Sequence, residues 1–174
     1  MELEKARAIA EGLKERLQPA CERIEIAGSI RRRKPEVGDI ELLCIPKYGG
    51  LSCHVNLLEQ VIIDLMHARI LDYRLNKRGR RAYGLKNKLM AHLPSGIGVD
   101  IFSTTEESWP VALVIRTGGA ETNKRIAIAA IRKGWHLKAY GSGFSTPQGE
   151  VICRSERDVF ELVGLPYLEP WERA

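Results

Sequence analysis

Three acidic residues of this 174-residue chain lie inside segments with the pattern of β-strands, and they are the first candidates for chemistry. Asp39 and Glu41 stand two positions apart in the segment 39–45, so both side chains leave the same face of one strand. Asp100 lies between two apolar residues in the segment 99–102. Carboxylates held close together repel one another strongly unless a cation or a proton lies between them. Oxygen ligands of this kind favour Mg²⁺ over zinc, so the pattern indicates a magnesium site.

The segment before Asp39 has the features of a phosphate site. The strand 24–26 runs into Gly28 and Ser29 at a helix start, which would offer backbone N–H groups and a hydroxyl to a phosphate. The basic run 31–34 adds guanidinium groups suited to bidentate phosphate binding. Each feature alone is usually a solvated turn or strand face, but together they supply a triphosphate clamp beside a metal site. Two divalent cations about 3.5–4 Å apart, bridged by such acids, are the usual device for phosphoryl or nucleotidyl transfer.

The elements that must position these residues divide the chain into two parts. For residues 1–110 the periodicity predicts helices at 3–17 and 55–68, strands at 24–26, 39–45 and 99–102, and a strand–turn–strand at 71–93. After Pro110 come an apolar segment at 111–115, a Thr-Gly-Gly break, helices at 121–133 and 155–163, a Gly/Ser/Pro-rich turn at 141–149 and a short strand at 150–153. We therefore predict an α+β fold, in which a mixed β-sheet with flanking helices (1–110) precedes a small, mostly helical domain (111–174).

Positive charge is concentrated in the middle of the chain. The formal net charge is +5, but residues 77–138 hold twelve Lys or Arg against four acids, and the remainder is mildly acidic. The segment 77–88 contains six Lys or Arg around one aromatic residue, Tyr83. By itself such a segment is a solvated hairpin or loop, but beside a site for phosphoryl or nucleotidyl transfer it would bind nucleic-acid phosphates, which fix position rather than sequence.

Composition excludes several classes of protein. With 44% apolar and 28% charged residues, the chain has the composition of a globular protein rather than of a disordered one. No apolar run approaches the roughly 18 residues of a membrane span, and the acidic N-terminus lacks the apolar core of a secretory signal. No CxxC pair occurs among the four cysteines, which argues against zinc and for a reduced, cytoplasmic protein; they are Cys21, Cys44, Cys53 and Cys153.

Several stretches resemble one known family, in the family's own order. GSIRRRKPEVGDIELL (28–43) is similar to the signature of the nucleotidyltransferase superfamily and, within it, of the family X (polymerase beta-like) DNA polymerases. VDIF supplies the third carboxylate, ALVIRTGGAETNKR is similar to the family's TG-containing segment, and KGWHLKAYG and DVFELVGLPYLEPWER resemble the last parts of its thumb. The resemblance implies a nucleotidyltransferase palm at 1–110, a thumb at 111–174 and no lyase domain, as in the minimal viral type of the family.

The resemblance also implies roles for individual residues. Asp39, Glu41 and Asp100 would be the catalytic residues that hold two Mg²⁺ ions, which Mn²⁺ can replace. The nucleotide-binding residues would be Gly28, Ser29, Arg32 and Gly38 at the triphosphate, Thr117 and Gly118 at the sugar, and Asn123 at the minor-groove edge of the new base pair; Arg116 is also expected to bind the nucleotide. The DNA-binding residues that we expect from the basic segments are Lys77, Arg78, Arg80, Arg81, Lys86, Lys88, Lys124 and Arg125.

The sequence departs from the family pattern at four positions. Ile115 and Arg116 stand where an aromatic pair is common, one ring of which helps to exclude ribonucleotides, so sugar discrimination is left open. Glu41 replaces the usual Asp and is one methylene longer. Gly98 stands two residues before Asp100, where an arginine is often found.

Three functions compete. The favoured hypothesis is a monomeric DNA-directed DNA polymerase that adds dNMP from dNTP to a DNA 3′-hydroxyl on primer–template or gapped duplex, in short-gap repair and without membrane association. The second is a template-independent or ribonucleotide-tolerant terminal nucleotidyltransferase, suggested by the departure at Ile115 and Arg116. The third is a catalytically silent DNA-end-binding module, which would bind gapped DNA with steep salt dependence yet incorporate nothing.

Overall fold

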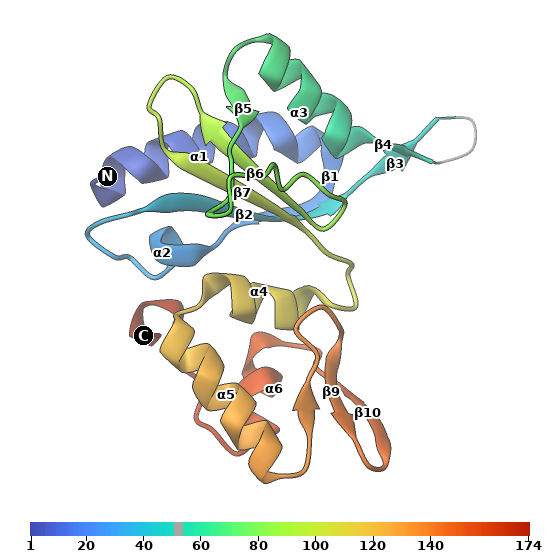
Figure 1. Cartoon of the computed structure of the whole chain (residues 1–174). Helices are drawn as coiled ribbons and strands as arrows, with labels where there is room; N and C mark the ends of the chain where they lie inside the picture. The colour runs from blue at the N-terminus through green and yellow to red at the C-terminus, as the bar shows by residue number, and fades with distance from the viewer. Residues whose placement is uncertain (51–53) are drawn as a thin grey trace.

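A five-stranded sheet forms the framework of the N-terminal part in the computed structural model, which describes residues 1–50 and 54–174 (Figure 1). The strand order is β1–β2–β7–β6–β5. The strands are Cys21–Ile26 (β1), Asp39–Pro46 (β2), Leu71–Tyr73 (β5), Asn87–His92 (β6) and Gly98–Ser103 (β7). β2 and β7 run parallel and the other neighbours antiparallel, so the predicted mixed sheet is confirmed. Cys53, one of the cysteines in the argument above, lies outside the described residues.

Two helices, α1 (Leu3–Leu17) and α3 (Leu57–His67), cover one face of this sheet (Figure 1). Ile40 and Leu42, which alternate with the acids of β2, are 0% exposed and pack in the core beneath these helices. α1 has the predicted bounds, whereas α3 begins two residues later than predicted because the Asn56 side chain caps it, accepting a hydrogen bond from the backbone N–H of Glu59. Asn56 instead ends β4 (Val55–Asn56), which pairs with β3 (Tyr48–Gly49).

The other face of the sheet packs against α4 (Trp109–Thr117), near the short helix α2 (Gly28–Arg31) (Figure 1). The apolar segment predicted at 111–115 is therefore helical, with Pro110 in its first turn, where proline is tolerated. One side of α4 joins the palm-side core through Trp109, Ala112 and Leu113, and the other joins the C-terminal core through Val111 and Val114. The predicted boundary at residue 110 thus lies inside a helix that both parts share.

The C-terminal part contains more strand than predicted. Its helices α5 (Ala120–Arg132) and α6 (Glu156–Glu161) accompany a three-stranded sheet in the order β10–β9–β8. The strands are His136–Leu137 (β8), Gly143–Thr146 (β9) and Gly149–Ile152 (β10); two 3₁₀ turns, Gln18–Ala20 and Pro170–Glu172, complete the chain's described elements. β9 lies inside the segment predicted as a turn, where Gly143 allows close strand approach: a Cβ there would lie 1.9 Å from the carbonyl oxygen of Val151. In the described residues no helix has the length and apolarity needed to span a membrane.

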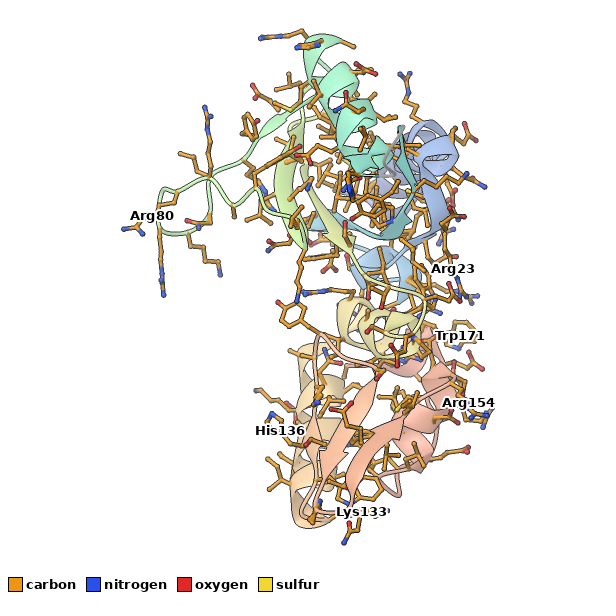
Figure 2. All side chains as sticks on the ribbon, turned by 90° about the vertical axis from the view of Figure 1, so that its right-hand side faces the viewer. Arg23, Arg80, Lys133, His136, Arg154 and Trp171 are labelled. Carbon is orange, nitrogen blue, oxygen red and sulfur yellow. The ribbon has the colours of Figure 1, made fainter. Side chains whose placement is uncertain are left out.

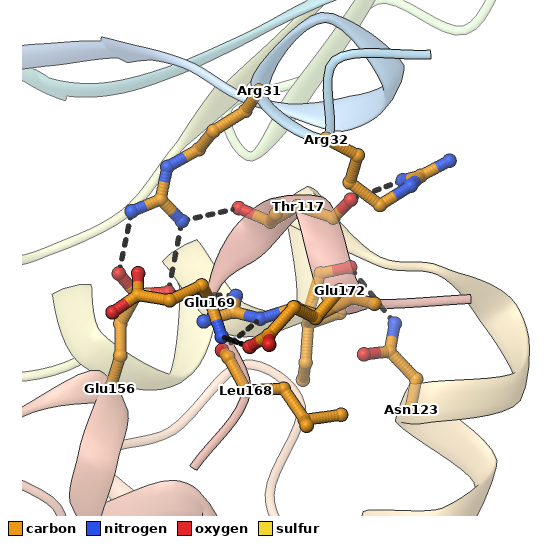
Figure 3. A network of polar contacts seen from close by, with 10 residues as sticks. Arg31, Arg32, Thr117, Asn123, Glu156, Leu168, Glu169 and Glu172 are labelled. Atoms are coloured by element: carbon orange, nitrogen blue, oxygen red, sulfur yellow. Dashed lines mark hydrogen bonds and ion pairs between the residues drawn. The ribbon is translucent and has the colours of Figure 1, made fainter.

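A buried ion-pair network joins α2 to the C-terminal part (Figure 3). Arg31 donates to both carboxylate oxygens of Glu156, at 2.6 and 2.9 Å, and to the hydroxyl of Thr117 at 2.7 Å. Arg173, whose side chain is 0% exposed, donates to the same carboxylate at 2.8 Å and to the carbonyl oxygen of Leu168 at 3.0 Å. A single carboxylate therefore ties the helix after β1 to α6 and to the last residues of the chain.

The charge of Glu156 depends on these partners. Burial raises the pKa of Glu156, but the hydrogen bonds and charges of Arg31 and Arg173 outweigh burial and hold that pKa below its usual value. Because the folded-state pKa is lower than the unfolded one, the network contributes stability above the unfolded pKa and loses it as the pH falls through the folded pKa.

The substitution Glu156→Gln tests this network. It leaves the buried Arg173 without a counter-charge, so we expect the free energy of unfolding to fall by about 3–5 kcal/mol in urea denaturation at pH 7. The variant should also lose less stability than the wild type as the pH falls from 5 to 3. Glu161→Gln is the matched control, since Glu161 forms an exposed pair with Arg157 and its removal should change the stability by less than about 0.5 kcal/mol. Equal costs in the two variants would contradict the account.

Candidate active site

The parallel pairing of β2 and β7 gathers the three predicted acids on one face of the sheet. Glu41 stands opposite Asp100, and Asp39 stands opposite Gly98. All three acids are half-buried, and the Asp100 side chain is 14% exposed. Strand alternation thus places the predicted carboxylates side by side, with their apolar neighbours in the core on the other face.

The three carboxylates repel one another. Burial, followed by the negative charges of Asp39 and Asp100, raises the pKa of Glu41 to about 7, although Arg32 and Arg116 oppose the shift. Burial also raises the pKa of Asp100, against the opposing effect of Arg74. A set of half-buried oxygen donors in mutual repulsion fits a divalent cation. In the described ranges 1–50 and 54–174, however, no three Asp, Glu, His or Cys side chains converge closely enough to enclose an ion in this conformation.

Arg74, which follows β5, contacts one of these carboxylates, and sequence reasoning missed it. Its guanidinium forms an ion pair with Asp100. The signal available in the sequence was Gly98, since a site that lacks an arginine two residues before Asp100 has room for one from elsewhere.

The predicted phosphate-binding turn lies directly against Glu41. Gly28 has a φ of +59°, and a Cβ at this position would lie 1.8 Å from Oε2 of Glu41, so both the conformation and the contact require glycine. The next hydroxyl, Ser29 Oγ, is buried and has no hydrogen-bond partner within the described part of the chain, as expected of a group that awaits an anionic ligand. Gly38, also predicted here, is exposed immediately before Asp39.

Arg32, which follows α2, reaches toward Thr117 at the end of α4 (Figure 3). Its guanidinium donates to the carbonyl oxygen of Thr117, and a Cβ on Gly118 would lie 2.8 Å from its Nη1. Thr117 is 0% exposed and its hydroxyl accepts from Arg31. In this ligand-free structure Arg32 and Thr117 therefore bind each other, and their predicted roles at the triphosphate and the sugar stay predictions.

The two positions before Thr117 differ from each other. Ile115 packs against the C-terminal core, and its carbonyl oxygen accepts a hydrogen bond from the Asn123 side chain at 3.0 Å. Arg116 places its guanidinium 3.8 Å from the centroid of the Phe102 ring and 5.5 Å from that of Tyr140. The side chains of Arg116, Phe102 and Tyr140 border a cleft of about 390 Å³ between the sheet and the C-terminal part. Arg116 thus bridges the two parts beside the carboxylates.

Most of the predicted DNA-binding residues are exposed. The β5–β6 connection projects from the molecule, with Arg80 near its tip (Figure 2). The exposed basic residues are Lys77, Arg78, Arg80, Arg81 and Lys86 on this connection, and Lys124 and Arg125 on α5. Arg81 is held over the ring of Tyr73, with 4.5 Å between its guanidinium and the ring centroid.

The prediction that Lys88 contacts DNA is wrong. Lys88 is 2% exposed, its ammonium donates to the carbonyl oxygen of Gly84 at 2.7 Å, and burial lowers its pKa. The reason is strand alternation: on β6, Lys88 shares the buried face with Met90, so a position that looked basic and exposed in the sequence points inward.

Comparison with known proteins finds similarity to DNA-synthesising enzymes over most of the chain. The family model for the DNA polymerase beta thumb matches residues 112–174, the part that begins within α4. The chain is 30% identical to DNA polymerase lambda of Rattus norvegicus over 161 residues, which cover 84% of this chain and 28% of that protein. It is 24% identical to DNA nucleotidylexotransferase of Xenopus laevis over 182 residues, which cover 86% of this chain and 36% of that protein.

The chain therefore spans little more than a third, at most, of the length of these two curated relatives. The two relatives match 84% and 86% of this chain, which is more than the segment 112–174 that the thumb model matches. The α+β fold with three acids on one face of the sheet, the match to the DNA polymerase beta thumb and the two relatives together support a family X polymerase-like protein.

Proposed function

We propose that the chain is a DNA polymerase of the family X type, which transfers dNMP from dNTP to a DNA 3′-hydroxyl and releases pyrophosphate. The observation that carries the proposal is the contact between Gly28 and Glu41: it joins the phosphate-binding turn to the row of carboxylates. A triphosphate seated at Gly28 and Ser29 would have its oxygens next to the acids, where metal-bridged phosphate chemistry requires them. The names of the two relatives, a DNA polymerase and a nucleotidylexotransferase, support the same reaction class.

The residues divide the work as follows. Asp39, Glu41 and Asp100 would hold two Mg²⁺ ions, or Mn²⁺ in their place, and these ions would supply Lewis-acid activation of the 3′-hydroxyl and neutralise charge at the triphosphate. Ser29 would donate its unpartnered hydroxyl to a phosphate oxygen. Arg32 would add its guanidinium after leaving the Thr117 carbonyl. No protein nucleophile is needed, because the attacking oxygen belongs to the DNA.

The exposed basic residues would bind the DNA backbone. Arg78 and Arg80 lie on the projecting β5–β6 connection, and Lys124 and Arg125 lie on α5 of the thumb. Contacts of this kind position a primer–template or a gapped duplex without reading its sequence. We propose that the protein fills short gaps as a monomer in a reduced, intracellular setting, which agrees with buried, unpaired Cys21, Cys44 and Cys153.

A second candidate rests on Ile115 and Arg116. Neither position offers a ring against the sugar: Ile115 packs into the thumb core and Arg116 lies over Phe102. This arrangement favours a transferase that accepts ribonucleotides or needs no template. Primer extension with and without a template strand, using dNTPs and rNTPs in parallel, separates the two candidates. A polymerase requires the template, a terminal transferase does not, and a DNA-end-binding module extends nothing.

Removal of Asp100 tests the proposed reaction. The variant Asp100→Ala should lose Mg²⁺-dependent filling of a single-nucleotide gap by at least about 10³-fold, while its far-ultraviolet circular dichroism and its affinity for gapped DNA stay close to wild type. Asp64→Asn, an exposed acid on α3, should retain full activity. Gap filling by Asp100→Ala at a rate near that of the wild type would contradict the proposed polymerase function.

The raised pKa of Glu41 predicts how stability depends on pH and metal. The folded-state pKa of about 7 exceeds the usual 4.5, so the metal-free protein should lose stability as the pH rises through that window, by on the order of 2–3 kcal/mol. Thermal unfolding in EDTA between pH 4.5 and 8 measures this loss. Mg²⁺ added at pH 8 should restore the melting temperature, and Glu41→Gln should show a smaller loss and a smaller metal effect. A pH profile shared by both proteins would contradict the prediction.

Salt dependence tests the DNA surface. The double variant Arg78→Gln, Arg80→Gln should weaken binding to gapped DNA and reduce the slope of log K against log salt by about 1–2. Lys88→Gln is the informative control, because the buried Lys88 should leave that slope unchanged while lowering thermal stability. Fluorescence anisotropy at several salt concentrations gives both slopes. If the slope became smaller in Lys88→Gln and stayed unchanged in the double variant, the proposed position of the DNA-binding surface would be wrong.

A further inference from the structure

Arg74, which no motif predicted, stands in line with the carboxylates across the sheet. Its backbone N–H donates to the carbonyl oxygen of Leu89 at 3.0 Å, which continues the β5–β6 pairing by one residue. Leu89 pairs with Asp100, and Asp100 pairs with Glu41. Residues in lateral register share a face of the sheet, so the Arg74 side chain reaches over the row at Leu89 to meet Asp100.

Gly98 makes this reach possible. A Cβ at position 98 would lie 2.8 Å from Cζ and Nη1 of Arg74 and 3.1 Å from its Nε. Those atoms therefore occupy the space that any larger residue at 98 would need. The guanidinium therefore lies over β7 between Gly98 and Asp100, and Gly98 stands opposite Asp39 in the β2–β7 pairing.

The contact is specific and incomplete. Arg74 forms an ion pair with Asp100, whose side chain is 14% exposed, while its own side chain is 34% exposed. Its Nε is buried and has no partner within the described residues. Because one N–H donor of this guanidinium has no acceptor, the side chain is held here by the charge of Asp100 rather than by a complete set of hydrogen bonds.

We propose that Arg74 is a positioning residue that competes with the divalent cation for Asp100. Its guanidinium holds the Asp100 carboxylate in the ion-free protein and releases it when Asp100 joins Asp39 and Glu41 around a cation. The inference rests on the proposed function, because it assumes that the row of acids binds metal. Under this proposal Arg74, which follows β5, controls the affinity of the acids for the metal.

The competition has a definite sign. Without Arg74, Asp100 is no longer neutralised by a direct partner, and the repulsion among the three carboxylates increases. The ion-free protein should then be less stable and should bind a divalent cation more tightly. The measurement belongs at pH 8, above the pKa of about 7 of Glu41, so that proton binding by Glu41 does not mask the effect.

Titration with Mn²⁺ in the absence of DNA, followed by the electron paramagnetic resonance of free Mn²⁺, measures the effect directly. Arg74→Gln should bind Mn²⁺ about tenfold more tightly than the wild type at one class of site. Gly98→Ala keeps the arginine but pushes its guanidinium away, and it should tighten binding to a similar extent. Because both changes break the same contact, the double variant should bind no more tightly than either single variant. Arg74→Lys, which keeps the charge, should restore affinity close to that of the wild type.

Arg154→Gln removes the same charge from an exposed position on the thumb and should leave Mn²⁺ affinity unchanged (Figure 2). If Arg154→Gln raised the Mn²⁺ affinity as much as Arg74→Gln does, the effect would come from net charge alone and the proposal would be overturned. The proposal would also be overturned if Arg74→Gln and Gly98→Ala bound Mn²⁺ with the affinity of the wild type, provided that the wild type binds Mn²⁺ and fills gaps. If the wild type does neither, the proposed function itself fails, and the inference with it.

Discussion

Mutual repulsion among Asp39, Glu41 and Asp100 is the constraint around which the site is organised. Three carboxylates on one face of two neighbouring strands need a counter-charge, and arginines from three separate elements face them: Arg74 after β5, Arg32 after α2 and Arg116 on α4. The cost of the arrangement appears as the raised pKa of Glu41. A fold keeps such a cluster at the expense of stability when the cluster has a ligand to bind. Divalent cations and the phosphates that accompany them meet that requirement.

The same short helix contributes to the proposed nucleotide site and to the contact between palm and thumb. α2 begins at Gly28 against Glu41 and ends at Arg31, which binds Glu156 of the thumb. Arg32 follows and donates to the backbone of Thr117. A triphosphate that attracted Arg32 would remove this hydrogen bond from the thumb side, whereas Arg31 and Glu156 would keep the two parts attached. If the proposed function holds, nucleotide binding and the position of the thumb would therefore be linked through adjacent arginines.

Elements that depend on local pattern were predictable from the sequence. The helix 3–17 and the strand that begins at Asp39 follow from periodicity, and the placement of three acids on one face follows from strand geometry. The helix at 109–117 was not predicted to be a helix. Its apolar run is continuous because both sides of the helix are buried, so the sequence lacks the one-sided pattern of an amphipathic helix. Arg74 and Lys88 were missed or misplaced because their positions depend on the register of β5 and β6, which pairing across the sheet decides. The Arg31–Glu156–Arg173 network joins residues 125 positions apart in the chain and has no local signature.

The most direct test of the account is a crystal structure with gapped DNA, a non-hydrolysable dNTP and Mn²⁺, in which anomalous scattering locates the metal. We expect two Mn²⁺ peaks about 3.5–4 Å apart. Asp39 and Glu41 should contact both ions, Asp100 should contact one, and Arg74 should have moved off Asp100. The absence of metal at these carboxylates, or a triphosphate bound away from Gly28 and Ser29, would contradict the account.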